Sequence, residues 1–201
     1  MLAAMNSSIR LDKRELILAK GSQVMTRRGY HGTGVMEIVQ AAGIPKGSFY
    51  HYFASKEDFA LQALAFIYRP RLERYAQALN DSVLSPRARI LAYYRDLLAH
   101  FARQETPQYH CFIGSLSFEM SEMLPAIGAE VAAIQQASVD ILRDCLEQAR
   151  AAGELGADED CDNLATFIAN AWQGVLARLK VGRSLQPLEA FIQRLELLLQ
   201  P

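Results

Sequence analysis

The stretch Gly43-Ile44-Pro45-Lys46-Gly47-Ser48-Phe49-Tyr50-His51-Tyr52-Phe53 constrains the fold of this 201-residue chain more than any other part of the sequence. It follows a short apolar segment that ends at Ala41-Ala42, and Gly43 supplies the permissive backbone that a sharp turn needs. Pro45 then fixes a backbone angle suited to the start of another helix. The pattern predicts two short helices joined by a tight turn, and the second helix begins with basic and polar residues.

Gly47 lies within this short second helix, where glycine is less favourable than alanine by about 1 kcal/mol. Local stability therefore does not explain its presence. Close approach of another backbone would explain it, because a side chain here would hold that backbone away. A helix of this kind, second in a helix-turn-helix, has the shape that enters the major groove of DNA.

The rest of the chain is predicted to be all-α, because apolar residues recur at helical spacing and no segment alternates as a strand does. Thr33 and the Ser55-Lys56-Glu57-Asp58 capping box are helix start signals, and Gly29 and Gly153 are stop signals. The expected helices cover residues 12–28, about 35–42, 45–53, 55 to about 80, 85 to about 104, 106 onward, about 126–152, about 158–183 and 187 onward.

Two domains are predicted, one at residues 1–54 and one at residues 55–201. Apolar residues at helical spacing form the expected core of the first domain: Leu16, Ile17, Val24, Met25, Ile38, Val39, Phe49 and Phe53. The last two helices carry a second apolar stripe, which would be exposed unless two copies of the chain pair. Its central members are Leu164, Phe167, Ile168, Ala171, Val175, Leu179, Phe191, Ile192, Leu195, Leu198 and Leu199.

Charge is divided unevenly along the sequence. Residues 1–56 carry eight Lys or Arg against three Asp or Glu, a net charge of +5, which leaves −6 for the remainder because the whole chain has −1. A basic N-terminal portion favours a polyanionic partner such as DNA. The alternative is an uneven but solvated surface.

The composition is that of an ordinary globular protein, with 51% apolar and 21% charged residues. No apolar run approaches the roughly 18 residues that a membrane span needs, and Met1–Arg10 has no signal-peptide pattern. We therefore expect a cytoplasmic protein with no membrane partner. Three cysteines at spacings unlike those of metal ligands predict neither a disulfide framework nor a structural zinc, and no cofactor is expected.

The segment from Arg14 to Phe59 resembles the TetR family of bacterial repressors. The resemblance is carried by Ile17, Gly29-Tyr30, Thr33, Val35, Ile38, Ala41-Ala42-Gly43, the stretch described first and Ser55-Lys56-Glu57. The chain departs from the common pattern at His31-Gly32-Thr33-Gly34, where two glycines flank the threonine and are expected to loosen the turn. The resemblance implies a homodimer that binds a near-palindromic double-stranded DNA operator, with the last two helices forming the dimer.

The family pattern also implies which residues contact DNA. Lys46 and Gly47 at the start of the second short helix would approach base edges, with Tyr50 beside them. Lys46 is the expected specific contact, since lysine can donate to guanine. Contacts to phosphate or sugar would come from Ser48, His51 and Tyr52, and from Thr33 and Lys56 on either side. The alternatives are a solvated charge for Lys46 and a partly buried core position for Tyr52.

Motifs beyond residue 60 are similar to those of NemR-like and AcuR-like repressors, which respond to reactive electrophiles. They are Arg89-Ile90-Leu91-Ala92-Tyr93-Tyr94, Cys111-Phe112-Ile113-Gly114-Ser115-Leu116, Glu119, Trp172-Gln173-Gly174, Leu179-Lys180 and Pro187-Leu188-Glu189. The resemblance implies a small-molecule effector or electrophile that is sensed by Cys111, Lys180, Tyr109 and Trp172.

Cys111 lies early in its expected helix, where backbone N–H dipoles would favour the thiolate. A buried core thiol is the alternative, since free cysteine is among the most buried residues. Cys145 is predicted to be core, and the acidic neighbours of Cys161 would oppose its ionisation. Lys180 would stabilise a Cys111 thiolate if the fold brings them together, and is otherwise a solvated charge.

Two other classes of protein compete with a regulator. His110 beside Cys111 suggests an enzyme, but adjacent helical side chains point about 100° apart, so adjacency does not make a nucleophile and base pair. No phosphate loop, zinc motif or nucleophile elbow is present, so we expect no enzyme. A structural helical partner protein is the third class, and a gel shift with the promoter region separates it from a DNA-binding protein.

Overall fold

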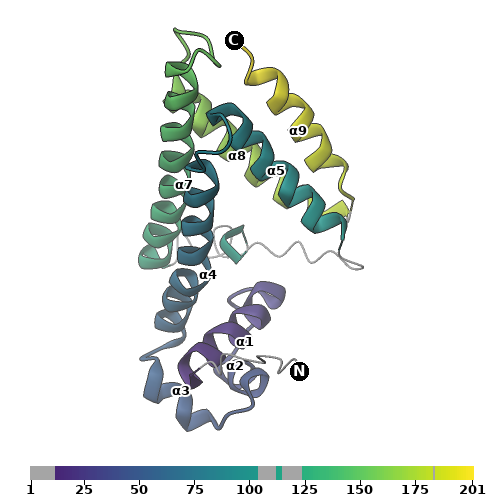
Figure 1. Cartoon of the computed structure of the whole chain (residues 1–201). Coiled ribbons are helices and arrows are strands. Elements are labelled where there is room, and N and C mark those ends of the chain that lie inside the picture. Colours follow the sequence, from purple (N-terminus) through teal and green to yellow (C-terminus); the bar gives the residue numbers. More distant parts are fainter. Residues whose placement is uncertain (1–11, 104–111, 115–123, 183) are drawn as a thin grey trace, which may run out of the picture. The chain divides into compact units, whose positions relative to one another are not determined.

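The computed structural model describes residues 12–103, 112–114, 124–182 and 184–201. These residues form helices joined by turns and contain no strand, which confirms the all-α prediction (Figure 1). The chain divides into two compact units, with the boundary after Ala63. The predicted domain boundary after residue 54 stays a prediction. The helices are α1 Lys13–Arg28, α2 Val35–Ala42, α3 Lys46–Tyr52, α4 Lys56–Leu79, α5 Pro86–Ala102, α7 Pro125–Ala151, α8 Cys161–Gly182 and α9 Gln186–Leu198.

Helix α1 has defined signals at both ends. The Asp12 carboxylate accepts a 2.8 Å hydrogen bond from the Glu15 N–H, which caps the start. Gly29 ends the helix with φ 77°, as the sequence predicted. The buried face is rotated slightly from the predicted one, because Leu18 is in the core whereas Leu16 and Val24 are half-buried.

The turn between α2 and α3 depends on Gly43, which adopts a left-handed conformation with φ 67°. Its N–H donates to the Gln40 carbonyl at 3.1 Å, and the Ile44 N–H donates to the Val39 carbonyl at 3.0 Å. These bonds satisfy carbonyls that would otherwise lack partners at the end of α2. Pro45 precedes α3 as its N-cap, one residue before the helix begins.

Three aromatic rings form the centre of the first unit. The ring of Phe53 lies 5.1 Å from that of Phe49 and 5.2 Å from that of Phe59, centre to centre. All three residues are buried, together with the predicted Ile17, Met25, Ile38 and Val39. Contacts of this kind add to the stability that burial of the ring area provides. The core therefore fixes α3 by its inner face.

Helix α4 begins with the predicted capping box and contains one internal proline. The Asp58 N–H donates to the Ser55 hydroxyl at 3.0 Å, and the Asp58 carboxylate accepts from the Ala54 N–H at 2.8 Å. Pro70 lies in the helix interior and has no N–H to donate to the Phe66 carbonyl four residues earlier. The helix is thus capped firmly at its start and lacks one backbone hydrogen bond near its middle.

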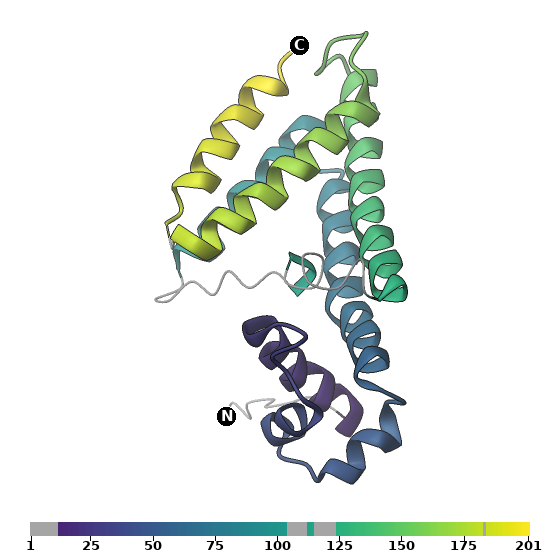
Figure 2. The ribbon, with the colours of Figure 1, turned by 180° about the vertical axis from the view of Figure 1, so that it is seen from behind.

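The second unit is held together by packing between α5, α7, α8 and α9. Helix α7 packs against α5 and α8, and α9 packs against α5 and α8 (Figures 1 and 2). Buried side chains from α4, α5, α7, α8 and α9 form one continuous core. Most of the helix bounds agree with the sequence predictions to within two residues.

Arginines on α5 bind groups from four neighbouring segments. The Arg89 guanidinium donates to the Leu79 carbonyl at 3.2 Å, the Leu84 carbonyl at 2.8 Å and the Gln148 side chain at 2.9 Å. Arg95 forms a 2.5 Å ion pair with Glu196 of α9. These contacts join the end of α4, the following loop, α7 and α9 to α5.

The helix expected from Thr106-Pro107 falls largely outside the described residues. Residues 112–114 are the described part of it, and they are helical. Within the parts of the chain that the structure describes, no helix is long and apolar enough to cross a membrane.

Candidate functional site

The outer face of α3 carries the exposed polar residues that the sequence singled out. Lys46, Gly47, Tyr50 and His51 are exposed, and Ser48 and Tyr52 are half-buried. Phe49 faces the opposite way and is buried against the aromatic core. The helix is therefore fixed from behind and offers a basic, polar and aromatic surface in front.

Gly47 has open space around it. Apart from its two chain neighbours and the nearby backbone of its own helix, no described atom would come within 4 Å of a Cβ built at this position. The glycine is therefore not required for packing inside the unit. The absence of a side chain instead leaves the first turn of α3 accessible to a partner.

The Tyr52 ring is partly covered by the rings of its neighbours. Its ring lies 4.9 Å from the His51 ring in an edge-to-face arrangement and 6.4 Å from the Phe53 ring. The half-buried ring agrees with the alternative that Tyr52 contributes to the core. Its exposed part still belongs to the same surface as His51.

Thr33 is not the N-cap of α2, contrary to the sequence prediction. The residue is 0% exposed, and its hydroxyl donates a 2.7 Å hydrogen bond to the Gly29 carbonyl. Helix α2 is capped at Gly34, whose N–H donates to the Glu37 carboxylate. Thr33 therefore does not cap α2, and its predicted contact with a DNA backbone stays a prediction. Its role in this structure is to close the turn between α1 and α2.

The two glycines around Thr33 do not loosen that turn. A Cβ on Gly32 would lie 2.3 Å from the Arg28 carbonyl oxygen, far inside contact distance. Glycine at position 32 allows this close approach. Arg28 and Glu37 also form an ion pair that links the end of α1 to α2. The turn is tight, contrary to the expectation from the sequence.

Lys56 is turned toward the α1–α2 turn rather than outward. Its ammonium donates to the Tyr30 carbonyl at 3.0 Å and to the Thr33 carbonyl at 3.1 Å, and lies 4.1 Å from the centre of the Tyr30 ring. Burial lowers the pKa of Lys56, against a smaller opposing effect of Glu37. The predicted contact of Lys56 with DNA phosphate stays a prediction, but two of its N–H donors already have partners.

Cys145 and Cys161 are poor candidates for a reactive thiol. Both are buried, as predicted for Cys145. The Cys145 thiol donates to the Pro86 carbonyl at 3.4 Å, and burial raises its pKa to about 11. Burial, followed by effects of nearby carboxylates including Glu147, also raises the pKa of Cys161 despite Arg150. Both sulfurs are therefore protonated at neutral pH.

The predicted sensing residues are only partly described. Cys111 and Tyr109 lie outside the described residues, so their distance to Lys180 is not part of the structure. Lys180 is exposed in the last turn of α8. Trp172 is half-buried, with its ring 5.3 Å from that of Tyr94 and 5.8 Å from that of Phe191. Trp172 thus belongs to an aromatic cluster between α5, α8 and α9.

Sequence reasoning missed two buried tyrosines on α4. The Tyr68 hydroxyl accepts a 3.0 Å hydrogen bond from the Ile113 N–H. Tyr75, one helical heptad later, donates to the Tyr94 hydroxyl, and burial raises the pKa of both Tyr75 and Tyr94. Spacing of seven residues on one helix was the signal that the two tyrosines share a face.

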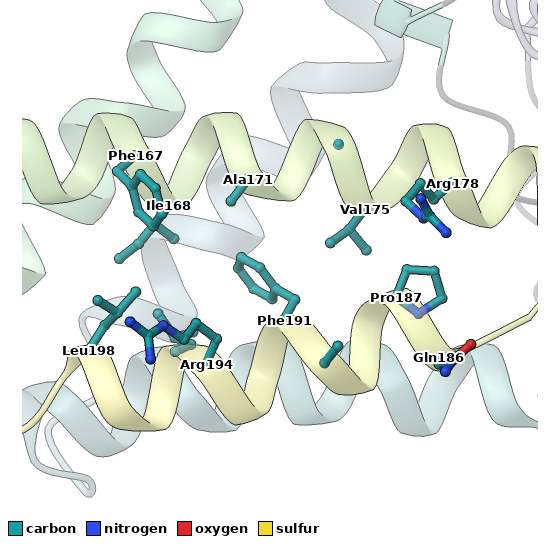
Figure 3. Close-up of a pocket in the computed structure, with 13 residues that line it drawn as sticks. Phe167, Ile168, Ala171, Val175, Arg178, Gln186, Pro187, Phe191, Arg194 and Leu198 are labelled. Atoms are coloured by element: carbon teal, nitrogen blue, oxygen red, sulfur yellow. The ribbon is translucent and has the colours of Figure 1, made fainter.

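An apolar groove runs between α8 and α9 (Figure 3). It has a volume of about 530 Å³ and is lined by apolar side chains, with Arg178 and Arg194 beside them. Phe167 points into it and is 53% exposed. The apolar part of the lining consists of Phe167, Ile168, Ala171, Val175, Pro187, Ala190, Phe191, Leu195 and Leu198.

Part of the apolar stripe that the sequence predicted on the last two helices is buried within a single copy of the chain. Leu164, Ile168, Val175 and Leu195 are buried within one copy of the chain, so they do not form an exposed stripe. Phe167 is the large apolar residue that remains exposed there. Among the described residues, no group of three His, Cys, Asp or Glu is placed to hold a metal ion.

Family comparisons account for both units. Residues 17–63 match the family described as bacterial regulatory proteins, tetR family, and residues 86–195 match the tetracyclin repressor-like C-terminal domain. The chain is 32% identical over 185 residues to the transcriptional repressor NemR of Escherichia coli (strain K12), covering 92% of each. It is 35% identical over 176 residues to the transcriptional regulator AcuR of Cereibacter sphaeroides, covering 87% of this chain and 80% of AcuR.

Solved structures have the same fold. Reduced Escherichia coli NemR matches with a TM-score of 0.87 and 31% identity, covering 95% of this chain and 99% of that one. A double cysteine mutant of the TetR family regulator CifR, crystallised with 26-base-pair operator DNA, matches with a TM-score of 0.78 and 26% identity, covering 90% and 94%. TetR family repressors bind DNA operators as dimers. From the match of both its units, the chain belongs to the TetR family of transcriptional repressors.

Proposed function

We propose that this protein represses transcription as a homodimer on a near-palindromic operator and releases the DNA when an electrophile or oxidant modifies Cys111. The observation that carries the DNA-binding part is the outer face of α3. That face is basic, exposed and open at Gly47, while Phe49 anchors the helix from behind. Each protomer reads one half of the operator, because paired recognition helices enter successive major grooves.

The exposed residues of α3 divide into two kinds of contact. Lys46 donates to a guanine edge in the major groove, which gives base preference, and Tyr50 lies beside it. Gly47 lets the DNA backbone or base edges approach the helix closely. Ser48, His51 and the exposed part of Tyr52 contact phosphate or sugar and fix the orientation of the helix. Lys56 supports this surface from the α1–α2 turn.

The homodimer forms through α8 and α9. The groove between these helices exposes Phe167 to solvent in a single copy of the chain, and an apolar surface of this kind is covered in a stable oligomer. A two-fold axis places the same groove on both copies. Pairing then sets the spacing of the two α3 helices.

Cys111 carries the sensing chemistry. Its thiolate adds to the β-carbon of an unsaturated carbonyl, which forms a C–S bond, and the enolate takes up a proton from water. With hypochlorous acid the thiolate is oxidised to sulfenic acid and chloride leaves. The Lys180 amine then displaces water from sulfur to form an S–N bond, if the two groups meet. Support comes from the similarity to NemR and from the protonated state of the two other thiols.

Modification releases DNA only if the modified protein favours an arrangement in which the two α3 helices no longer fit the operator. The loss of affinity equals the coupling free energy, typically 1–3 kcal/mol or about 5- to 150-fold. A reversible small apolar ligand would act through the same coupling without a covalent bond. The test must therefore separate covalent from reversible release.

A promoter gel shift, repeated with hypochlorite and with N-ethylmaleimide, tests both parts of the proposal. Wild-type protein should bind its promoter region and release it after either reagent. Cys111→Ser should bind and resist release, whereas the matched variants Cys145→Ser and Cys161→Ser should release like wild type. Release of Cys111→Ser as readily as wild type would leave a reversible ligand as the better account. Absence of any promoter shift would favour a helical partner protein.

A further inference from the structure

Tyr68 of α4 holds the short segment 112–114 by its backbone. The Tyr68 hydroxyl oxygen accepts the Ile113 N–H at 3.0 Å, across 45 residues of sequence. The bond is buried, and Tyr68 itself is buried with the Arg71 guanidinium 5.1 Å from its ring centre. A buried N–H that loses its acceptor is strongly unfavourable, so this contact constrains where residues 112–114 can lie.

The segment that Tyr68 holds is itself packed into the protein. Phe112 is 2% exposed and Ile113 is 3% exposed. Packed interiors have little free volume, so added bulk at a neighbouring residue shifts the segment rather than being absorbed in place. Cys111 is the residue directly before Phe112 in the sequence. A group attached to Cys111 that enters this packed interior would strain the hydrogen bond between Ile113 and Tyr68, two residues further along the chain.

The helix that carries Tyr68 also begins with Lys56. The Lys56 ammonium holds the Tyr30 and Thr33 carbonyls of the α1–α2 turn, next to the helix-turn-helix. Pro70 lies in the same helix, two residues after Tyr68, and its lack of an N–H removes one backbone hydrogen bond of α4. Helices bend most readily where a bond of this ladder is absent. A change at Tyr68 thus falls beside the weakest part of α4.

We infer that the Tyr68 hydroxyl is a positioning group for effector response: its bond to Ile113 is made in the unmodified, DNA-binding form and is lost when Cys111 is modified. The inference rests on the proposed sensing role of Cys111. Tyr68 touches neither the effector nor DNA. It stabilises the arrangement of α4 that suits operator binding, and modification removes that stabilisation.

Loss of the Tyr68 hydroxyl should change operator binding by the unmodified protein only. If the bond exists in the unmodified form alone, Tyr68→Phe weakens operator binding by unmodified protein and leaves binding by modified protein unchanged. The ratio of the two dissociation constants then falls by the net effect of one buried hydrogen bond, about two- to tenfold. A tyrosine with only a general packing role would change both dissociation constants equally.

Tyr75→Phe is the matched control. Tyr75 lies on the same face of the same helix, is buried, and donates its hydroxyl to Tyr94 instead of holding residue 113. Operator dissociation constants are measured by fluorescence anisotropy for wild type and both variants, before and after N-ethylmaleimide. Mass spectrometry establishes complete alkylation of Cys111, and circular dichroism establishes folding. The expected result is a smaller release ratio for Tyr68→Phe and a wild-type ratio for Tyr75→Phe.

Hydrogen exchange at the Ile113 amide gives a second readout on the unmutated protein. Its exchange should accelerate when Cys111 is alkylated, because the amide loses the Tyr68 hydroxyl as an acceptor. Unchanged exchange, or a Tyr68→Phe release ratio equal to that of wild type, would overturn the inference while the sensing role of Cys111 stood. Wild-type protein that keeps its operator after complete alkylation would overturn the proposed function and this inference together.

Discussion

The Lys56 ammonium lies 4.1 Å from the centre of the Tyr30 ring and donates a 3.0 Å hydrogen bond to the carbonyl oxygen of the same residue. A cation over an aromatic face and a bond to a carbonyl are both favourable, and the second carbonyl, from Thr33, adds to them. Lys56, the first residue of α4, thus joins the start of that helix to the turn that precedes α2.

Replacing Lys56 by Met should weaken operator binding without changing its dependence on salt. Methionine keeps an unbranched apolar side chain but removes the ammonium that holds the turn. A lysine that neutralises a phosphate lowers the salt slope by about one when it is removed. We expect an unchanged slope and a lower melting temperature for Lys56→Met, measured by anisotropy titrations at several salt concentrations and by thermal denaturation. A slope reduced by one would assign Lys56 to the DNA backbone instead.

Lys46→Ala should weaken specific binding by about 1–3 kcal/mol and relax base preference at one position of each half-site. Lys46 is exposed at the start of α3, and its removal takes no contact from the core. Lys20→Ala is the control, because it removes the same charge from an exposed position on another helix, α1. Competition titrations with operator and unrelated DNA distinguish the two. Equal loss on both DNAs for Lys46→Ala would contradict a base contact.

Phe167→Asp should convert the protein to a monomer that loses its operator. A carboxylate in the α8–α9 groove would be desolvated between apolar surfaces, and a central aromatic anchor contributes about 2 kcal/mol or more. Val181→Asp is the control, because Val181 lies on the same helix, is 87% exposed and does not line the groove. Sedimentation velocity at micromolar concentration measures the outcome. A dimeric Phe167→Asp protein would place the interface elsewhere.

Cys145 should resist thiol reagents at neutral pH. Burial raises its pKa from 9.0 to about 11, so its thiolate fraction at pH 7 is about 100-fold below that of an ordinary thiol. Labelling should accelerate about tenfold per pH unit up to pH 11. The same shift is a stabilising contribution that is present below pH 9 and is lost as pH rises toward 11. Mass-spectrometric labelling of Cys111→Ser protein checks this, and rapid labelling of Cys145 at pH 7 would contradict it.

Local signals in the sequence predicted most of the fold because they act over a few residues. Gly43 and Gly29 are positive-φ helix ends, and Ser55 caps α4, as expected. The same reasoning failed at Thr33, which has the residue type of an N-cap. The position of Thr33 is decided by its burial and by its hydrogen bond to the Gly29 carbonyl. Neither can be recognised from the residue types that mark a helix cap.

The candidate sites were predictable to different extents. The residues of α3 expected to contact DNA followed from the family resemblance, and the inward position of Phe49 followed from its place in the predicted apolar core. The direction of the Lys56 side chain did not follow, because its acceptors are carbonyls 23 and 26 residues earlier. The contact of Tyr68 with residue 113 spans 45 residues and uses a backbone N–H, which carries no sequence signature.

The three acceptors of the Arg89 guanidinium bear on how the second unit opens. They come from the last turn of α4, the loop after it and the last turn of α7. Arg89 therefore opposes fraying at the end of α4, because its guanidinium is also bound to Gln148, which lies 59 residues after Arg89. Segments joined in this way exchange their amide hydrogens as one cooperative unit. The end of α4 should thus show the hydrogen-exchange protection of the helical core.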